Sequence, residues 1–551
     1  MTEQPFLPPL ERFYQWEKQR PDAVWLSQPE GNDQWRDYTW AQVGDQARRM
    51  AAALQELGLK HGDKVGLYGA NTARWVMTDI AIMMAGGVSV PIYASMPEDK
   101  LLYIMEHSDM TVLFADDSCA MNLDTLMQTV GNSVQLISLT DSGGHKNWTE
   151  LINTYSPVAG SPVRAADDLW SISYTSGTTG KPKGVMHSFE TLPYSVAHMP
   201  EMTKTNEQSV FFSYLPLAHI AERGVVELHS LYCGGHVYFN ESRETFVRDL
   251  LRARPTFFLA VPRIWHNLKA GIVNQMGEEA WKQLLKNPEA AREAGKKILA
   301  SMGLERVTYA FSGSAPIPAT DIEAWMTLGM PLYEGFGQSE TLAGTANTPD
   351  AYRFGSIGKM ISDEAEMKIT EEGELCLRSQ GNMLGYYKDP EKTAETIIDG
   401  WIHTGDKVRV DEDGFVFITG RVKDIFKTAK GKYVAPAPIE QRFGTLNCLE
   451  QLCLVGRGLP QTILLVVLNE PAIARDKAEL AEELQATLNN VNAELEVHER
   501  ISHIVICQED WSIENEMLTH TLKIKRDEVE EKLRSTLELC VAGTDSPIVW
   551  E

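Results

Sequence analysis

Residues 174–184, with the sequence YTSGTTGKPKG, have the composition of a loop that binds phosphate. Glycines and small hydroxyl residues let backbone N–H groups approach an anion closely, and the two lysines add positive charge. The segment is not a Walker A loop, because Gly177 and Gly180 are separated by two residues where that motif has four. A solvent-exposed flexible loop is the alternative. This order of residues, directly after the apolar run 169–174, favours phosphate binding.

Residues 333–340, YEGFGQSE, combine an aromatic ring, two glycines and an acid. The third glycine of a dinucleotide-binding fingerprint is absent, and Glu340 stands there instead. A carboxylate at this point is an oxygen ligand of the kind that a hard cation prefers. It could equally cap the start of a helix, and the residues alone leave both readings open.

Several other polar residues give little evidence of a functional role when each is considered alone. Asp406 and Arg421 read as surface charges, and His219 in an apolar segment reads as a packed core residue. Lys523 lies in a basic cluster before an acidic stretch, with Lys525 as a competing candidate. The small residues of 312–316 predict an ordinary turn between a strand and a helix.

The elements around these residues follow an alternating pattern. Residues 63–68 and 88–93 read as strands, and residues 72–85 between them as a helix with Asn71 as its N-cap. Such a βαβ unit predicts a parallel sheet with a right-handed crossover. Further strand-like runs are expected at 112–115, 134–139, 256–261 and 307–312.

The pattern changes after about residue 360. Residues 374–378 and 415–419 alternate like hairpin strands, and they are followed by strands at 453–455 and 463–468 and charged helices at 472–493 and 527–537. The predicted fold class is α/β, with a large layered α/β N-terminal domain and a small mobile α+β C-terminal domain. We expect the N-terminal domain to span 1–420, a hinge to span 421–424 and the C-terminal domain to span 425–551.

Length and charge narrow the class of function. The chain has 551 residues, 43% of them hydrophobic, and a formal net charge of −25. This charge argues against a general nucleic-acid binder, although a local basic pocket could still hold a small anion. Seven cysteines without CxxC spacing predict free thiols, and the sequence shows no secretion signal and no membrane span. A cytoplasmic protein is expected.

The phosphate loop resembles the signature loop of the AMP-forming adenylate-forming enzymes, the superfamily of acyl-CoA synthetases, luciferases and peptide-synthetase adenylation domains. Six further segments resemble this superfamily in the correct order. Residues 254–265 are in addition similar to long-chain fatty acyl-CoA synthetases. The six segments are LPLAH at 215–219, SGSAP at 312–316, YEGFGQSE at 333–340, WIHTGD at 401–406, GRVKD at 420–424 and THTLK at 519–523.

The resemblance implies a nucleotide site. Phe336 would lie against adenine, Ser339 would donate to the α-phosphate, and Asp406 would accept from the ribose hydroxyls. Glu340 and Thr178 would hold Mg²⁺, and both are counted with Lys523 as catalytic. The residues expected to bind ATP or AMP are Thr175, Ser176, Gly177, Thr178, Thr179, Gly180, Lys181, Gly313, Ser314, Ala315, Glu334, Gly335, Phe336, Ser339, Asp406 and Arg421.

The resemblance also implies moving parts. Lys523 would bridge the substrate carboxylate and the α-phosphate, and its match to the motif favours it over Lys525. Lys423 would be the pivot of the C-terminal domain, and His219 would position the substrate. Relatives often carry two glycines and an acid where this chain has AKGK at 429–432, and the two lysines there could favour the phosphates of CoA.

The implied function is an AMP-forming fatty acyl-CoA synthetase for a medium- to long-chain carboxylic acid, with ATP, Mg²⁺ and CoA. Phe257, Phe258, Ile264 and Trp265 could line or gate an acyl tunnel, although most of them also read as core. The alternatives are an acyl carrier protein ligase, another adenylate-forming enzyme and a nucleotide-binding regulator without catalysis. The resemblance leaves room for a homodimer and for peripheral contact with the inner face of a membrane.

Overall fold

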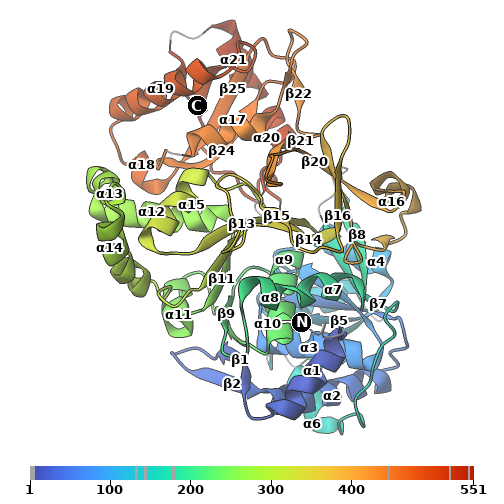
Figure 1. Ribbon diagram of the computed structural model, residues 1–551. Coiled ribbons are helices and arrows are strands. Elements are labelled where there is room, and N and C mark those ends of the chain that lie inside the picture. Colours follow the sequence, from blue (N-terminus) through green and yellow to red (C-terminus); the bar gives the residue numbers. More distant parts are fainter. Residues whose placement is uncertain are drawn as a thin grey trace.

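A computed structural model describes residues 6–130, 134–141, 145–175, 181–444, 446–519, 523–543 and 546–551. The protein is of the mixed α/β class, with a large N-terminal part and a smaller C-terminal part. Figure 1 shows the C-terminal part in orange and red above the rest of the molecule, with β13 to β16 between it and the blue and green part.

The largest sheet lies in the N-terminal part and has the strand order β18-β8-β7-β4-β3-β5-β6. The strands from β7 to β6 run parallel, and β8 and β18 are antiparallel to their neighbours. The strands are β3 (Lys64–Gly69), β4 (Val88–Tyr93), β5 (Met110–Ala115), β6 (Gln135–Ser138), β7 (Leu169–Thr175), β8 (Lys183–Ser188) and β18 (Gly385–Tyr386).

Three further sheets complete the N-terminal part. The first consists of β1 (Val24–Pro29), β2 (Trp35–Thr39), β9 (Val210–Ser213) and β10 (His236–Phe239). The second consists of β11 (Phe257–Ala260), β12 (Tyr309–Ser312), β13 (Leu332–Gln338), β14 (Thr341–Ala346) and β15 (Lys359–Met360). The third consists of β16 (Glu366–Ile369), β17 (Glu374–Arg378), β19 (Ile397–Ile398), β20 (Trp401–Val410) and β21 (Val416–Arg421).

Helices cover these sheets. They are α1 (Pro9–Gln19), α2 (Trp40–Glu56), α3 (Ala73–Ala85), α4 (Glu98–Ser108), α5 (Leu123–Val130), α6 (Trp148–Thr154), α7 (Thr191–Ala197), α8 (Met199–Thr203), α9 (Ile220–Glu222), the π-helix η1 (Arg223–Leu228), α10 (His229–Cys233), α11 (Phe246–Ala253), α12 (Pro262–Met276), α13 (Glu278–Leu285), α14 (Pro288–Ser301), α15 (Ala319–Leu328) and α16 (Pro390–Thr396).

The C-terminal part has its own hydrophobic core, built from residues between Phe426 and Trp550. Its strands are β22 (Phe426–Lys427), β23 (Tyr433–Val434), β24 (Leu449–Val455), β25 (Thr462–Leu468), β26 (Ile501–Ile506) and β27 (Ile548–Trp550). Its helices are α17 (Pro436–Glu440), the 3-10 helix η2 (Gln441–Phe443), α18 (Glu470–Ile473), α19 (Lys477–Glu494), α20 (Arg526–Lys532) and α21 (Arg534–Ala542). The domain boundary at 421–424 stays a prediction.

Two contacts join the parts on one side. Arg263 of α12 forms an ion pair with Glu450 of β24. Gly444 packs so closely against Pro318 that an added Cβ would lie 2.4 Å from the Pro318 Cγ atom. The C-terminal part is therefore seated against the helices around α12 and α15 in this structure.

The βαβ prediction is confirmed, since β3 and β4 pair in parallel across α3. The predicted N-cap was wrong by one residue: the Thr72 hydroxyl accepts from the Trp75 N–H, while the amide of Asn71 bonds residues of another segment. Asn71 instead donates to the Leu215 carbonyl and accepts from the Leu217 N–H, and so it fixes the segment before His219. The C-terminal helices also differ, since the expected helix at 472–493 starts at Lys477 and the one at 527–537 is divided at Leu533.

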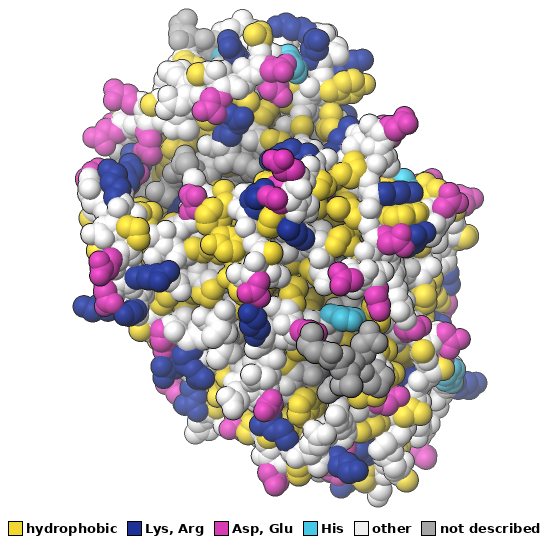
Figure 2. All heavy atoms as spheres, in the orientation of Figure 1, with side chains coloured by type: hydrophobic (Ala, Val, Ile, Leu, Met, Phe, Trp, Pro, Cys, Tyr) yellow, Lys and Arg dark blue, Asp and Glu magenta, His cyan; other side chains and the backbone are white. Residues whose placement is uncertain are grey.

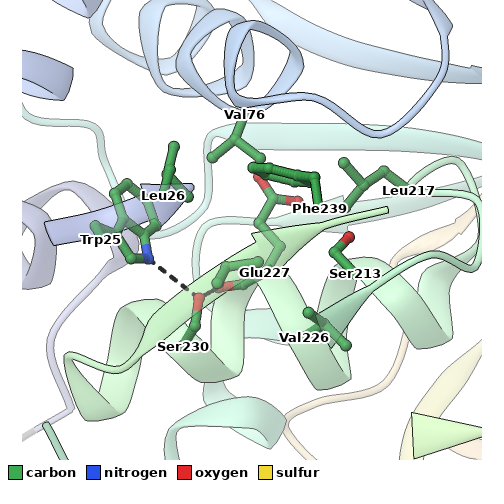
Figure 3. A pocket seen from close by; sticks show the side chains of 10 residues that line it. Trp25, Leu26, Val76, Ser213, Leu217, Val226, Glu227, Ser230 and Phe239 are labelled. Atoms are coloured by element: carbon green, nitrogen blue, oxygen red, sulfur yellow. Dashed lines mark hydrogen bonds between the residues drawn. The ribbon is translucent and has the colours of Figure 1, made fainter. Parts of the chain in front are cut away.

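A cavity of about 10 Å³ lies in the core beside α3 and η1 (Figure 3). Trp25 and Ser230, joined by a hydrogen bond, and Glu227 are among its lining side chains. Burial raises the pKa of Glu227 well above its ordinary value, and the charge of Arg223 opposes this shift. The cavity has room for about one water molecule and none for an acyl chain.

The four residues considered for an acyl tunnel differ in how deeply they are buried. Phe257, Phe258 and Trp265 are at most 2% exposed and belong to the hydrophobic cores, whereas Ile264 is half-buried. The core reading of the three rings is therefore confirmed. All seven cysteines have free thiols, as predicted.

Candidate active site

The predicted phosphate loop joins the antiparallel strands β7 and β8, where Thr175 and Lys183 are paired. Ser176, Gly177, Thr178, Thr179 and Gly180 lie outside the described residues. Lys181 is exposed, with its Nζ atom 5.5 Å from the centre of the Tyr103 ring. The Lys183 Nζ atom lies 5.6 Å from the centre of the Tyr386 ring. The two lysines thus lie near aromatic rings of two different elements, α4 and β18, at the C-terminal end of the loop.

The segment predicted to carry adenine follows β12, which pairs in parallel with β13. A Cβ atom added to Gly313 would lie 3.4 Å from the Gly335 carbonyl oxygen, so these two glycines are neighbours on adjacent strands. A Cβ atom on Gly335 would meet the Phe311 ring at 2.5 Å, which excludes larger residues there. Ser314 adopts a left-handed φ of 68°, and Ala315 is exposed. The segment is the turn between β12 and α15, so the strand-to-helix reading is confirmed, and its contact with adenine stays a prediction.

Glu340 lies in the turn between β13 and β14, and the helix-cap reading was wrong because a strand, not a helix, follows it. The Tyr386 hydroxyl donates to the Glu340 Oε1 atom at 2.6 Å. The ring of His187 bonds the Ser339 carbonyl at 2.7 Å, and burial lowers the pKa of His187 to about 4. A neutral His187 donating from Nε2 fits this contact. Both sides of the hairpin turn are therefore held by hydrogen bonds.

Phe336 belongs to the same hairpin. Its ring is half-buried and packs against the hydrophobic cluster beneath β17 and β20. Glu334 is buried, and its Oε1 atom accepts from the Ile317 N–H at 3.3 Å. Burial raises the pKa of Glu334 to about 8. The Glu334 side chain thus supports the turn after β12, and its contact with nucleotide stays a prediction.

Asp406 and Arg421 face each other across β20 and β21. The Arg421 Nε atom donates to Asp406 Oδ1 at 2.9 Å, and the Gln338 amide donates to Asp406 Oδ2 at 2.6 Å. Burial raises the pKa of Asp406, and the charge of Arg421 opposes that shift. Asp406 is thus an acceptor held in a fixed position, which suits a ligand with hydroxyl groups.

Glu374 was missed in the sequence. Its Oε1 atom accepts from the Gly405 N–H at 2.8 Å, and its Oε2 atom lies 2.8 Å from His403 Nδ1. Cys376 Sγ is 3.5 Å from the same ring nitrogen. The carboxylate therefore holds the part of β20 that carries Asp406. Because these residues come from two different strands, no local spacing could have revealed them, and the same holds for Gln338 and Tyr386.

His219 is held by its own backbone. Its Nδ1 atom accepts from the Ala221 N–H at 3.1 Å, so the neutral ring carries its proton on Nε2. Burial, and then the positive charge of Lys523, lower the pKa of His219 to about 3. We therefore do not expect His219 to accept a proton at neutral pH. We expect it to position a ligand by donating a hydrogen bond from Nε2.

The side chain of Lys523, in the C-terminal part, is exposed to solvent but lies near charged groups of the N-terminal part. Desolvation by the surrounding protein lowers the pKa of Lys523, and the charge of Arg421 adds to this effect. The carboxylates of Asp406 and Glu340 oppose it. The ammonium group of Lys523 therefore interacts electrostatically with all three and with His219. Lys523 thus lies near residues that are more than a hundred positions away from it in the sequence.

Backbone contacts hold the loop on either side of residues 520–522, which lie outside the described residues. The Thr519 N–H donates to the Lys523 carbonyl at 2.8 Å, and the Lys523 N–H donates to the Thr519 hydroxyl at 3.0 Å. Lys525 precedes α20 directly.

The predicted hinge follows β21 immediately. The Val422 N–H donates to the Gly405 carbonyl at 2.8 Å, and Lys423 is exposed. The charge of Lys423 contributes to lowering the pKa of Lys183, so the two lysines lie near each other. The role of Lys423 as a pivot stays a prediction.

The lysines and arginines of the face drawn in Figure 2 are spread among other side chains. On this face, the lysines and arginines of the described residues are interspersed with acidic side chains and form no broad basic area (Figure 2). Among the described helices, none has the length and apolar character needed to cross a membrane.

Comparison with known families covers most of the chain. The family described as AMP-binding enzyme matches residues 13–387, which is more than half of the chain. The AMP-binding enzyme C-terminal domain matches residues 423–541.

Curated relatives match over nearly the full length. Fatty acyl-CoA synthetase A of Dictyostelium discoideum is 29% identical, over 92% of this chain and 86% of that protein. The long-chain-fatty-acid–CoA ligase FadD15 of Mycobacterium bovis is also 29% identical, over 92% of each chain.

Solved structures share the fold. The anthranilate CoA ligase AuaEII in complex with anthranoyl-AMP has a TM-score of 0.80 at 22% identity, over 98% of this chain and 99% of that one. The adenylation domain of a carboxylate reductase from Mycobacterium chelonae has a TM-score of 0.83 at 23% identity, over 98% of this chain and 92% of that one.

Proposed function

Because this chain belongs to the family of AMP-binding enzymes, we propose that it is an AMP-forming fatty acyl-CoA synthetase. It activates a medium- to long-chain carboxylic acid with ATP and transfers the acyl group to the thiol of CoA. The observation that carries the proposal is the position of Lys523, whose charge acts on Asp406, Glu340 and His219 in the N-terminal part. A protein that merely bound nucleotide would have no use for a cation delivered from a second domain.

In the first half-reaction, the carboxylate of the fatty acid attacks the α-phosphorus of ATP, and pyrophosphate leaves. Two anions must approach each other, so the Lys523 ammonium group between them lowers the barrier by electrostatic stabilisation. The adenine lies on the Gly313–Ala315 turn with Phe336 against it, and the ribose hydroxyls donate to Asp406. The loop from Thr175 to Lys181 holds the β- and γ-phosphates, and Ser339 contacts the α-phosphate.

Glu340 fits a magnesium site, because its carboxylate is a hard oxygen ligand whose Oε1 atom is held by Tyr386 at 2.6 Å. We assign Glu340 and Thr178 as the residues that would hold Mg²⁺. When bound, the ion neutralises phosphate charge.

In the second half-reaction, the C-terminal domain turns about Lys423, and Lys523 leaves the cleft. The thiolate of CoA then attacks the carbonyl carbon of the acyl-adenylate, and AMP leaves. A thiol needs little help from a base, so the neutral His219 acts by donating from Nε2 to position the acyl group.

The acyl specificity rests on the relatives. Proteins named fatty acyl-CoA synthetase or long-chain-fatty-acid–CoA ligase match over more than nine-tenths of this chain. A cytoplasmic enzyme with peripheral contact to a membrane, where fatty acids partition, accords with this substrate. A homodimer remains a proposal as well.

A panel of acids tests the function. The full-length protein is incubated with ATP, Mg²⁺ and acids from acetate to long-chain fatty acids, with either CoA or a phosphopantetheinylated acyl carrier protein as acceptor. We expect AMP and acyl-CoA to form fastest with medium- to long-chain acids. Transfer to the carrier protein alone would identify an acyl carrier protein ligase. Absence of acid-dependent pyrophosphate exchange with every acid would instead leave a nucleotide-binding protein without catalysis.

A further inference from the structure

The pair of strands β17 and β20 brings a thiol, an imidazole and a carboxylate together. Cys376 of β17 and His403 of β20 are direct partners in the antiparallel register. Glu374 stands two residues before Cys376 on the same strand, and both side chains reach the same ring nitrogen of His403. One possible ligand atom from each of the three side chains lies within 4.8 Å of the other two. The arrangement is therefore a candidate metal site that joins two neighbouring strands.

The spacings between the three atoms are close to those of a tetrahedral metal site. Cys376 Sγ lies 3.5 Å from His403 Nδ1, and Glu374 Oε2 lies 2.8 Å from the same nitrogen. Around a tetrahedral zinc ion, a sulfur ligand lies about 3.5 Å and an oxygen ligand about 3.3 Å from a nitrogen ligand. The sulfur already has this separation, and the oxygen needs to move by only about 0.5 Å to reach it.

The chemistry of the three side chains selects the ion. A thiolate with an imidazole favours zinc, whereas magnesium and calcium prefer oxygen ligands alone. The thiolate and the carboxylate also cancel the two charges of Zn²⁺, which matters because Cys376 is 0% exposed. The side chains of His403 and Glu374 are 21% and 20% exposed, so an ion can reach them from solvent. Water would then be the fourth ligand.

Neighbouring groups orient the site without occupying it. The Gly405 N–H donates to Glu374 Oε1 at 2.8 Å, which fixes the carboxylate with its Oε2 atom toward His403. Hydrogen bonds of this outer kind are what orients the ligands of metal sites. Lys368 of β16 is the partner of Cys376 on the other side, and its Nζ atom lies 4.5 Å from the centre of the Trp401 ring.

We propose that Glu374, Cys376 and His403 form a binding site for one Zn²⁺ ion. On binding, the Cys376 thiol releases its proton to water and the Zn–S bond forms. The proton that His403 donates from Nδ1 moves to Nε2, and the Nδ1 lone pair and Glu374 Oε2 bind the ion. Each ion therefore releases one proton. The bond of Glu374 to Gly405 is kept, and the inference does not depend on the proposed function.

The test measures metal binding by the full-length protein in the absence of ATP. In calorimetry, about one Zn²⁺ should bind per chain and about one proton should be released. Co²⁺ should give the charge-transfer absorption of a thiolate ligand, and this band should disappear in Cys376→Ser. In both Cys376→Ser and His403→Ala, the Kd for Zn²⁺ should rise by about tenfold or more, because losing a ligand weakens binding at least as much as losing an outer hydrogen bond. Excess Mg²⁺ should not compete.

Cys119→Ser is the matched control, because it removes the one cysteine that is not buried. It should keep both the cobalt band and the Kd for Zn²⁺. Thermal melting without metal reports whether each variant folds, and added Zn²⁺ should raise Tm in the wild type and in Cys119→Ser only. If Cys376→Ser does not fold, His403→Ala decides.

The inference is overturned if the wild type shows no thiolate-to-cobalt band, or if folded Cys376→Ser or His403→Ala keeps the wild-type Kd for Zn²⁺. Glu374 and His403 would then be a hydrogen-bonded pair that supports β20 and binds no metal. A wild type that binds zinc at this site but forms no acyl-CoA would refute the proposed function and leave this inference standing.

Discussion

The two halves of the candidate active site are prepared in different ways. In the N-terminal part, Glu340 and Asp406 already accept hydrogen bonds from Tyr386, Gln338 and Arg421. In the C-terminal part, the Lys523 ammonium group has no hydrogen bond or ion pair to any residue that the structure describes. Its placement depends on how the loop and the domain around it are seated.

The proposed nucleotide cradle, which we define as Glu340 and Asp406 with their hydrogen-bond donors, is fixed within the N-terminal part. The delivered charge, the ammonium group of Lys523, is brought to it by the C-terminal part. Hydrogen-bonded carboxylates keep their geometry whether or not the C-terminal part moves. A lysine without such bonds can leave the cleft at little cost and return to it. The comparison therefore predicts that changes in the N-terminal part affect nucleotide binding, and that changes at Lys523 affect one half-reaction alone.

The largest expected effect comes from Lys523→Ala. Without the ammonium group, the repulsion between carboxylate and α-phosphate is not relieved, so acid-dependent pyrophosphate exchange should fall by about 10²-fold or more. Thioester formation from a supplied acyl-adenylate should stay close to wild type. Lys525→Ala is the matched control and should spare both steps. Equal loss of both half-reactions in Lys523→Ala would contradict the delivered-charge role.

The next effect is expected from Glu340→Gln. The amide oxygen can still accept from Tyr386, so the hairpin should keep its shape while the charged metal ligand is lost. Pyrophosphate exchange should fall by about 10–100-fold, and half-saturation should require more Mg²⁺. Tyr386→Phe keeps the carboxylate and should cost less. An unchanged Mg²⁺ dependence in Glu340→Gln would rule out this ligand.

A smaller effect should follow from Glu374→Gln, which tests whether the cradle is positioned by its surroundings. The variant weakens the hold on Gly405 and His403, so Asp406 is presented less accurately. KM for ATP should rise by roughly 3–10-fold with kcat little changed, which is the signature of lost uniform binding. Glu366→Gln, on the exposed pair with Arg378, is the control. A drop in thermal stability with an unchanged KM would assign Glu374 a purely structural role.

The pH dependence of adenylation probes the delivered charge without removing it. Lys523 acts as an ammonium ion, and its pKa is lowered by desolvation and by Arg421. The rate of pyrophosphate exchange should therefore decline on the alkaline side at a pH below the ordinary pKa of lysine. In Lys523→Arg, any remaining activity should decline at higher pH, because guanidinium stays charged. Identical alkaline limbs in both proteins would refute this assignment.

The smallest effect concerns the stability of the N-terminal part. The pKa of Glu334 is raised from 4.5 to about 8 in the folded protein. Between these values the folded state binds the proton that the unfolded state has lost, so the contribution of Glu334 to stability falls as pH rises. Glu334→Gln should have a higher Tm than wild type at pH 9, and the difference should disappear at pH 5. A difference that does not depend on pH would show that Glu334 does not titrate as inferred.

Much of the fold was predictable because short patterns determine it. The run at 88–93 and the strand at 374–378 have the predicted bounds, since apolar alternation marks a strand locally. The N-cap at Thr72 was not predictable, because Asn71 bonds residues 215 and 217, which are far along the chain, and the break at Leu533 has no signal in the hydrophobic pattern. Element ends depend on single hydrogen bonds that hydrophobic patterns do not report.

The motifs predicted the main residues of the candidate site, but they did not predict the residues that hydrogen-bond those residues. Glu340, Asp406 and Lys523 stand in segments that resemble a family, and the structure brings their charges together. Tyr386, Gln338 and Glu374 reach the site from distant strands, so their sequence neighbours give no sign of them. Whether Glu340 begins a helix or lies in a hairpin was likewise decided by a pairing partner far along the chain.

The hairpin of β20 and β21 connects Asp406, the proposed ribose contact, to the predicted hinge. Arg421 holds Asp406, and the next residue, Val422, donates to Gly405 beside it. A rotation of the C-terminal part about Lys423 would strain these two hydrogen bonds. If Asp406 holds the nucleotide and Lys423 is the pivot, as we propose, rotation of the C-terminal part also loosens the nucleotide, and release of AMP follows completion of the rotation.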